Sequence, residues 1–387
     1  MKASHVLGGA MALALPMSAA FAEDETVKLG MVMSYSGWFQ PIDAATINGA
    51  MLAVNEINAN GGILGKQIET ITFDNKSDPA LGADGATEVI AAGAKAMIVP
   101  SDFDFSAPAT LVGQEAGVLM FSGASDRKFG TLGIGNMAFS ISNDSVTQGA
   151  LLADWASGTK GWKTAYVLLD NTISYTKTLC GSFADNFRKI AGEGAVLGED
   201  TFLNGDATID SQIGRIKALP TAPDMVVICT YAPGGPSAIR QMRAAGIDAP
   251  IVSGESMDGD YWLGTVPDLS NFYALNFGSY VGDDSEPAVN DFFARYEAAY
   301  GKRSDVSYAL RGYSMVEAWA RAANKAGSVE PLDVMAALEA FNDEPLVVGP
   351  TTFTATDRIA MDRPMAIMKV EKGVVSFEGR FSAPAAN

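Results

Sequence analysis

The sequence has little of what most enzymes and metal sites need. Its 387 residues contain one histidine, His5, and two cysteines, Cys180 and Cys229. His5 lies in an N-terminal segment with the features of a cleavable leader, so the exported chain has no histidine. That absence excludes Ser/His/Asp and Cys/His catalytic pairs and any His-ligated zinc. Histidine is also the commonest general base near neutral pH. We therefore expect that the protein is not an enzyme and that it binds no metal and no cofactor.

The two cysteines leave their pairing open. Cys180 falls in an expected helix and Cys229 in an expected buried strand, in consecutive βα units. A disulfide between them is geometrically possible and would persist in an oxidising compartment. We favour two reduced, buried thiols, because a fold of this size needs no covalent staple.

Long apolar runs are missing beyond the N-terminus. Val6 to Leu15 is apolar, follows a weakly basic start, and precedes Ala20-Phe21-Ala22, which fits the small-x-small rule of signal peptidase. A run of about ten residues is too short to span a bilayer as a helix. We therefore expect residues 1–22 to be a signal peptide, Glu23 to begin a soluble mature protein, and the protein to be exported to the periplasm.

Positive charge is also scarce. The formal net charge is −18, from 27 Lys and Arg against 45 Asp and Glu. Such an acidic surface repels phosphate backbones, so we expect no nucleic-acid partner. The length exceeds what one hydrophobic core usually organises, which predicts two domains.

What the sequence does have is a regular alternation of short apolar runs and longer amphipathic ones. In the first half we expect strands at 27–33, 68–73, 96–99 and 118–121, and helices at 42–58, 79–92 and 107–115. The pattern then restarts, with helices at 144–157, 175–191, 209–219 and 236–245, and strands at 165–169, 195–202, 225–229 and 250–252. Each series predicts a parallel sheet covered by helices on both faces.

The C-terminal part completes these two units without starting a third. It predicts helices at 286–300, 307–326 and 331–341 and a strand at 365–370. We expect the chain to cross between units near residue 275 and again near 349–353. The fold class is therefore α/β, with two doubly wound parallel-sheet lobes joined by a three-strand hinge. Lobe 1 is expected to comprise 23–142 and 276–350, and lobe 2 to comprise 143–275 and 351–387.

Two equivalent loops point to a ligand site. One expected strand leads into Ser122-Gly123-Ala124-Ser125, and its counterpart in the second unit leads into Ser253-Gly254-Glu255-Ser256. Ligands of open α/β sheets bind outside the carboxyl ends of strands, so two facing units would form a cleft. Trp38, in the loop after the first strand, would line the mouth of the cleft or pack into the core.

Several motifs carry a family resemblance. They are Ser36-Gly37, Asn48-Gly49-Ala50, Asn55-Glu56-Ile57-Asn58, Gly61-Gly62-Ile63-Leu64-Gly65, Asp74 with Ser77-Asp78-Pro79, and Arg240-Gln241 with Arg243-Ala244-Ala245-Gly246. Together they resemble the periplasmic leucine/isoleucine/valine-type binding proteins of ABC transporters. The resemblance implies a type I periplasmic binding fold, ligand capture by hinge closure, a monomer, and permease subunits as membrane partners.

The resemblance also implies roles for individual residues. Gly123, Ala124 and Ser125 fall on the loop whose amides and hydroxyl hold a ligand carboxylate. Glu255 falls on the acidic residue that pairs with the ligand ammonium, in a loop where a buried carboxylate needs a partner. Tyr175 and Tyr231 fall on tyrosines that wall the site and can make cation–π contacts. The alternative for Glu255, which we disfavour, is a solvated loop residue, and the alternative for Ser125 is part of an ordinary turn.

One segment departs from the family pattern. Where the family has a serine- and threonine-rich loop, this chain has Ser101-Asp102-Phe103-Asp104-Phe105-Ser106. Asp102 and Asp104 would repel a ligand carboxylate, so they favour a donor-rich ligand such as an amide, a polyamine-like group or hydroxyls. They lack the third ligand that a metal site needs. The family's first-lobe cysteines are also missing, which puts a branched-chain amino acid in doubt.

The sequence thus predicts a solute receptor of an ABC importer that binds an amino acid or a related small polar or amide-type molecule. One alternative is a ligand-sensing module of a membrane receptor, since the same fold serves both roles. Another is a binding protein for an aromatic or other non-amino-acid solute.

Overall fold

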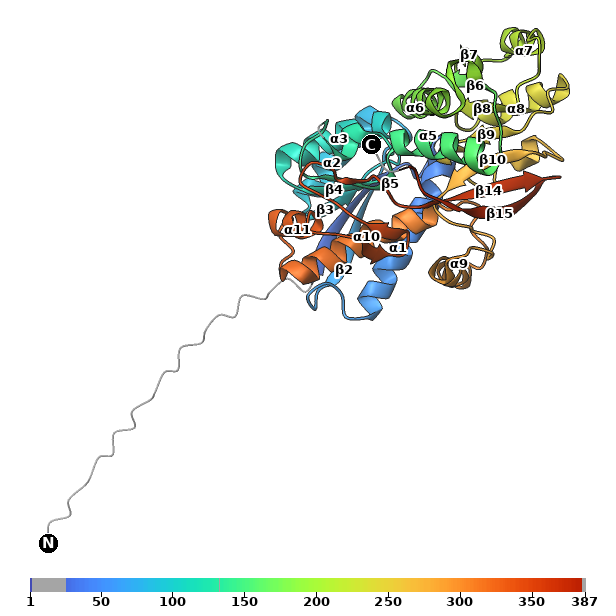
Figure 1. Ribbon diagram of the computed structural model, residues 1–387. Coiled ribbons are helices and arrows are strands. Elements are labelled where there is room, and N and C mark those ends of the chain that lie inside the picture. The colour runs from blue at the N-terminus through green and yellow to red at the C-terminus, as the bar shows by residue number, and fades with distance from the viewer. Residues whose placement is uncertain (2–25, 132, 385–387) are drawn as a thin grey trace.

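The chain folds into two α/β lobes, each built around its own largely parallel sheet (Figure 1). The computed structural model describes residues 26–131 and 133–384, together with Met1. The expected signal peptide, apart from Met1, and the expected start at Glu23 lie outside the described residues. In the described part of the chain, no helix is both long enough and apolar enough to cross a membrane.

The first lobe contains a six-stranded sheet in the order β13-β5-β4-β3-β1-β2, and all neighbouring strands are parallel. Its strands are β1 (Thr26–Met33), β2 (Gln67–Asp74), β3 (Ala96–Ile98), β4 (Leu119–Ser122), β5 (Ala138–Asn143) and β13 (Ile359–Ala360). The helices of this lobe are α1 (Gln40–Ala59), α2 (Pro79–Ala91), α3 (Phe103–Ala116), α4 (Arg127–Gly130), α9 (Pro287–Tyr300), α10 (Tyr308–Ala326) and α11 (Pro331–Leu338). Helix α1 packs on α10, and α2 packs on α3. A short hairpin, β11 (Glu344–Leu346) and β12 (Gly349–Thr351), follows α11.

The second lobe contains a seven-stranded sheet in the order β15-β14-β10-β9-β8-β6-β7. Its strands are β6 (Ala165–Asp170), β7 (Val196–Phe202), β8 (Met225–Cys229), β9 (Ile251–Ser253), β10 (Phe272–Asn276), β14 (Met365–Glu371) and β15 (Val374–Phe381). The two C-terminal strands pair antiparallel, and the others pair parallel. Its helices are α5 (Ser145–Asp154), with a π-helical turn at Trp155–Thr159, α6 (Ser174–Ala191), α7 (Asp210–Lys217) and α8 (Gly234–Ala244). Three 3-10 turns complete the lobe, at Glu193–Ala195, Glu255–Met257 and Leu263–Thr265.

This arrangement confirms the predicted α/β class with two doubly wound sheets, but it moves the last crossing between the lobes. Ile359 and Ala360 pair with β5 at the edge of the first sheet. The chain therefore leaves the first lobe only after Ala360, and the crossing predicted near 349–353 is wrong. A two-residue strand has no periodicity to reveal it, so the sequence pattern could not place this boundary. The earlier crossings follow Asn143 at the end of β5 and Asn276 at the end of β10.

Aspartate side chains begin several helices of the two lobes. Asp78 accepts a hydrogen bond from the amide of Ala80 at 2.8 Å, and Asp102 accepts one from the amide of Asp104 at 2.9 Å. Each aspartate satisfies a backbone donor that the first helical turn leaves without a partner. Asp102 therefore has a structural role at the start of α3, whatever else it contacts.

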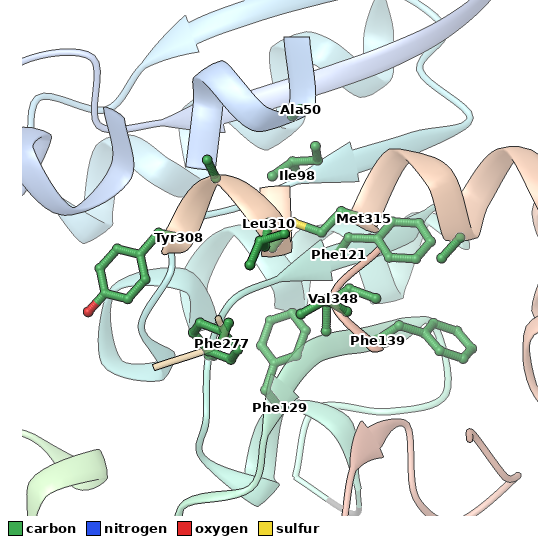
Figure 2. Packing of buried hydrophobic residues seen from close by; sticks show 14 of the residues in the cluster. Ala50, Ile98, Phe121, Phe129, Phe139, Phe277, Tyr308, Leu310, Met315 and Val348 are labelled. Atoms are coloured by element: carbon green, nitrogen blue, oxygen red, sulfur yellow. The ribbon is translucent and has the colours of Figure 1, made fainter. Parts of the chain in front are cut away.

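A large apolar cluster holds the first sheet against its helices. Figure 2 shows Phe121, Phe129 and Phe139 close to Leu310 and Met315 of α10. All five side chains are at most 1% exposed. The first turn of α10 lies next to the loop after β4, where Arg311 contacts the Gly123 carbonyl, and next to the second lobe, where Tyr308 contacts Glu255.

Cys180 and Cys229 form a disulfide. Helix α6 packs on β8, which brings the two Cα atoms to 5.7 Å, within the usual range for a disulfide. The interpretation as two reduced thiols is therefore wrong, because it weighed the size of the fold and not the packing of this helix on this strand. The disulfide ties together the elements that carry Tyr175 and, two residues after β8, Tyr231.

Candidate functional site

The carboxyl ends of strands from both lobes meet at one cavity of about 40 Å³. The first lobe contributes Phe39, Ile42, Ser101, Asp102, Phe105, Ser125, Tyr308 and Arg311, and the second contributes Ile173, Tyr175, Tyr231, Glu255 and Ser256. Most of these residues lie within five residues after the end of β3, β4, β6, β8 or β9. The topology therefore produces the cleft that the two equivalent loops predicted.

Glu255 is the centre of the polar contacts in this cavity. It follows β9 at the start of a 3-10 turn and is 5% exposed. The Ser125 hydroxyl, from the opposite lobe, donates a hydrogen bond to its Oε1 at 2.9 Å. Burial raises the pKa of the Glu255 carboxyl, and Arg311 and Ser125 oppose the shift. Glu255 is thus a buried carboxylate facing the other lobe, which is where a ligand cation would be held.

Arg311 is a charged residue of the cavity lining that the sequence analysis missed. It lies in the first turn of α10, is 1% exposed, and its Nη1 is 3.6 Å from Glu255 Oε2. The guanidinium carbon lies 3.8 Å from the centre of the Tyr308 ring, in cation–π geometry. Figure 2 shows the Tyr308 hydroxyl directed away from the apolar cluster, and this hydroxyl donates to the Glu255 carbonyl at 2.6 Å. The available signal was an arginine within the otherwise apolar start of the 307–326 helix.

The 122–125 loop presents a hydroxyl to the cavity but not the predicted nest of amides. The Ala124 amide donates to Ser122 Oγ at 3.0 Å, so it is used within the loop. The Gly123 carbonyl accepts from Arg311 Nη1 at 3.3 Å. Neither Gly123 nor Ala124 is among the described residues that line the cavity, whereas Ser125 is. The predicted role of the Ala124 amide is therefore wrong, and Gly123 contributes a carbonyl that orients Arg311.

The two predicted tyrosines both line the cavity. Tyr175, in the first turn of α6, is 4% exposed and its hydroxyl donates to Gln148 Oε1 at 2.9 Å. Tyr231 follows β8 and is 6% exposed. Burial is the largest cause of a raised pKa at both hydroxyls, with Glu255 adding to the shift at Tyr175. Both tyrosines are therefore uncharged at neutral pH, and their rings and hydroxyls form part of the cavity wall.

The two aspartates of the divergent segment face different places. Asp102 lines the cavity, and burial, reinforced by the nearby charge of Asp104, raises its pKa to about 7. Asp104 Oδ2 instead accepts a hydrogen bond from the Ser174 amide of the second lobe at 2.7 Å. Only Asp102 is therefore placed to contact a ligand inside the cavity.

Trp38 lies outside the cavity, over its mouth. It is 48% exposed and packs edge-on against Phe39 and Phe105, with ring centres 5.3 and 5.2 Å away. With Asp104, Phe105 and Tyr231 it lines an open hollow of about 600 Å³ next to the cavity. Among the residues that the structure describes, no group of three or more His, Cys, Asp or Glu side chains is placed to hold a metal ion.

Comparisons with known proteins identify the family. The model of the periplasmic binding protein family matches residues 26–374. The chain belongs to this family. Periplasmic binding proteins of this kind are solute receptors and not enzymes, which confirms the prediction made from the missing histidine.

Among curated relatives, this periplasmic binding protein is 25% identical over 356 residues to the Leu/Ile/Val-binding protein BraC3 of Rhizobium johnstonii, covering 90% of this chain and 93% of that protein. It is 26% identical over 348 residues to the leucine-, isoleucine-, valine-, threonine- and alanine-binding protein of Pseudomonas aeruginosa, covering 86% and 87%. Among solved structures, LivJ of Streptococcus pneumoniae in complex with isoleucine has a TM-score of 0.80 at 27% identity, covering 92% of this chain and 99% of LivJ. The fold is shared at 19% identity with a Rhodopseudomonas palustris solute-binding protein in complex with benzoate, with a TM-score of 0.77 over 94% and 98% of the chains. These matches confirm the type I periplasmic binding fold.

Proposed function

We propose that this protein is the periplasmic receptor of an ABC importer and captures an amino acid, or a related small polar molecule, between its lobes. The observation that carries the proposal is the buried Glu255 of the second lobe facing Ser125 and Arg311 of the first. A ligand ammonium at Glu255 would supply the partner that a buried carboxylate requires. The names of BraC3, LivJ and the Pseudomonas relative, all binding branched-chain amino acids, support the ligand class.

Capture requires the lobes to separate. Sites for small molecules usually measure about 300–1,000 Å³, and the cavity between the lobes is about 40 Å³. Bonds between the lobes, such as Ser125 to Glu255 and Ser174 to Asp104, would break when the lobes open and form again around a ligand. Three crossing segments between the lobes provide the hinge for this motion.

The partners follow from the same role. A closed receptor offers a surface formed by both lobes, which the permease subunits of the importer would recognise. A leader at residues 1–22 would deliver the chain to the periplasm, and the receptor would act there as a monomer.

The test is ligand binding by the purified protein. A thermal-shift screen of amino acids, their amides and aromatic acids should give a rise in melting temperature for its ligand, because binding to the folded state stabilises it by mass action. Calorimetry on Glu255→Gln should then show a loss of about 2–5 kcal/mol in binding free energy for a ligand with an ammonium group. Glu115→Gln, an exposed carboxylate of α3, is the matched control. If no member of the screen binds, the amino-acid proposal is wrong.

A second ligand class has its own supporting observation. The cavity and its mouth are walled by aromatic side chains, with Phe39 stacked on Phe105 at 5.0 Å and Trp38 edge-on to both. Flat apolar groups pack well against such rings. A preference for aromatic over aliphatic members of the screen, lost in Trp38→Ala or Phe105→Ala, would favour an aromatic solute.

A further inference from the structure

The guanidinium of Arg311 is buried with unusually incomplete bonding. Its Nε is 3.3 Å from Thr46 Oγ1, and its Nη1 is 3.3 Å from the Gly123 carbonyl. The contact with Glu255 Oε2, at 3.6 Å, is longer than the 2.7–2.9 Å of a direct charged hydrogen bond. Its Nη2 has no hydrogen-bond partner among the described residues. A buried arginine with unused donors, lining a ligand cavity, is placed to bind an acceptor that arrives with the ligand.

Two aromatic rings and helix α1 hold Arg311 in place, and the Phe277 ring centre lies 5.6 Å from its guanidinium carbon. The Tyr308 ring stacks on its plane at 3.8 Å, and the contact with Thr46 ties its Nε to α1. These contacts fix the plane of the guanidinium, while its fork of N–H groups has only long contacts at Nη1 and no partner at Nη2 among the described residues. Such a fork matches the two oxygens of a carboxylate.

The charges around the cavity limit what else the ligand can carry. Glu255 and Asp102 line the cavity, and Asp43 lies fully buried behind it, with its carboxylate accepting from the amides of Ser34 and Ser101. Burial raises the pKa of all three carboxyl groups. A ligand with net negative charge would add an unpaired charge to this set. A zwitterion adds none, because its ammonium offsets Glu255 while its carboxylate offsets Arg311.

We propose that Arg311 binds the carboxylate of a zwitterionic ligand, whose ammonium is bound by Glu255 across the cleft. This inference rests on the proposed function. The ligand would insert into the gap between the two side chains, with Ser125 free to donate to the carboxylate once Glu255 has a cationic partner. In the family pattern a serine- and threonine-rich loop stands at 101–106, where this chain has Asp102. Arg311 would take over from that loop as the principal anion-binding group. With the ligand carboxylate held at Arg311, the carboxyl group of Asp102 no longer has to contact it. This explains how Asp102 can line a cavity that binds a carboxylate.

The first experiment needs no substitution. Calorimetry would compare leucine, phenylalanine and glutamine with their α-amides, which keep the ammonium and lose the carboxylate, and with the corresponding acids that lack the amino group. For the amino acid that binds most tightly, we expect each change to weaken binding at least about 100-fold, because each leaves a buried charge without its partner. Equal binding of the amide overturns the inference and leaves the receptor function standing. Binding by none of these compounds contradicts the amino-acid function itself.

The second experiment assigns the effect to Arg311. In Arg311→Gln the amino acid and its amide should differ by less than about threefold, because the anion-binding group is gone, and Arg311→Lys should restore part of the difference. A purely structural role for Arg311 would weaken both compounds equally and leave their ratio unchanged. Arg321→Gln, an exposed arginine of the same helix that pairs with Glu317 and Glu344, is the control and should keep the full ratio.

Removing one charge of a buried pair can unfold a protein. Circular dichroism of Arg311→Gln checks this, and the double variant Glu255→Gln/Arg311→Gln keeps the charge balance if the single variant fails to fold. The double variant should show no measurable difference in affinity between the amino acid and its amide. A retained preference for the amino acid over its amide in either variant overturns the assignment of Arg311.

Discussion

The backbone amide of Ser174 donates a hydrogen bond of 2.7 Å to Oδ2 of Asp104, and this bond joins the first turns of two helices in opposite lobes. It lies at the exposed rim of the cleft, outside the cavity where Glu255 and Arg311 face each other. We expect opening of the lobes to break it, because its two partners belong to different lobes. We therefore expect Asp104 to stabilise the closed arrangement of the lobes, whereas the sequence suggested a direct contact with the ligand.

Replacing Asp104 by alanine should weaken ligand binding without changing which ligand is preferred. Loss of one exposed hydrogen bond to a carboxylate costs about 1 kcal/mol of closed-state stability, which corresponds to a fall in affinity of about fivefold. Calorimetry with the best ligand and one weaker analogue measures both quantities. Glu115→Ala, near the other end of α3, serves as the control. A changed order of ligand preference would show that Asp104 contacts the ligand after all.

Asp102 should make the stability of the protein depend on pH. Its pKa is about 7 in the folded state against 3.8 when exposed. Between these values the folded protein holds a proton that the unfolded chain has lost, so the free energy of unfolding falls as the pH rises from about 4 to about 7. In Asp102→Asn the amide oxygen still caps α3, and this part of the pH dependence disappears.

The comparison of Asp102→Asn with the unmodified protein isolates this residue from the other buried carboxyl groups, such as Asp258. The gain in stability of the variant should be larger at pH 8 than at pH 5, by about 1–3 kcal/mol. Urea unfolding at the two pH values measures it. A difference of equal size at both pH values would mean that Asp102 is ionised throughout.

Local periodicity predicted most of the fold but missed several strands, of which β5 is the most instructive. Helices such as α1 and α6 carry a long apolar pattern, and their expected ranges agree with the structure to within two residues at each end. Strand β5 went unrecognised because its sequence, Ala-Phe-Ser-Ile-Ser-Asn, has serines at buried positions. Those serines bond to backbone carbonyls of the neighbouring loop, as Ser140 does with Ala124 at 2.6 Å. Such long-range contacts leave no local signal in the sequence.

The residues of the site also fall into a group that the sequence could predict and one that it could not. Glu255, Ser125, Tyr175 and Tyr231 follow strands whose ends converge by topology, so the strand order and the resemblance together could predict them. Arg311 comes from the part of the chain that returns to the first lobe late, and no pattern near it indicates which way its side chain points. Its role depends on how α10 packs against α1, which only the three-dimensional structure supplies.

The disulfide should contribute substantially to stability and little to binding. It closes a segment of 49 residues, and the chain-entropy estimate for a loop of that length is about 4 kcal/mol, with typical measured values of about 2–4 kcal/mol. Urea unfolding of Cys180→Ala/Cys229→Ala should show a loss in this range, while affinity stays within about twofold because neither sulfur lines the cavity. A reducing agent should destabilise the unmodified protein by the same amount as the double substitution does. It should leave the stability of the variant unchanged. Two thiols titrated in the denatured, unreduced protein would contradict the pairing.

Helices α1 and α10 approach each other through a reciprocal pair of glycines, which positions Arg311. A Cβ atom on Gly49 would lie 2.0 Å from the carbonyl oxygen of Ala309, and one on Gly312 would lie 1.9 Å from that of Thr46. Both obstacles are backbone atoms of the facing helix, so neither can move aside without separating the helices. The site depends on this approach, since Thr46 also contacts Arg311 Nε at 3.3 Å.

Gly312→Ala should therefore lower both stability and affinity. Overpacking of this kind costs about 1–3 kcal/mol or more, and displacement of α10 should also move the neighbouring Arg311 away from the cavity. Gly181→Ala is the matched control, because a Cβ there meets no atom of the described chain within 4 Å. Gly181 lies inside α6, so this change should raise stability by about 0.5–1 kcal/mol through helix propensity. Thermal melts and calorimetry of the two variants give the comparison. If Gly312→Ala is as stable as the control and binds normally, then the close contact of α1 and α10 does not position the anion-binding arginine.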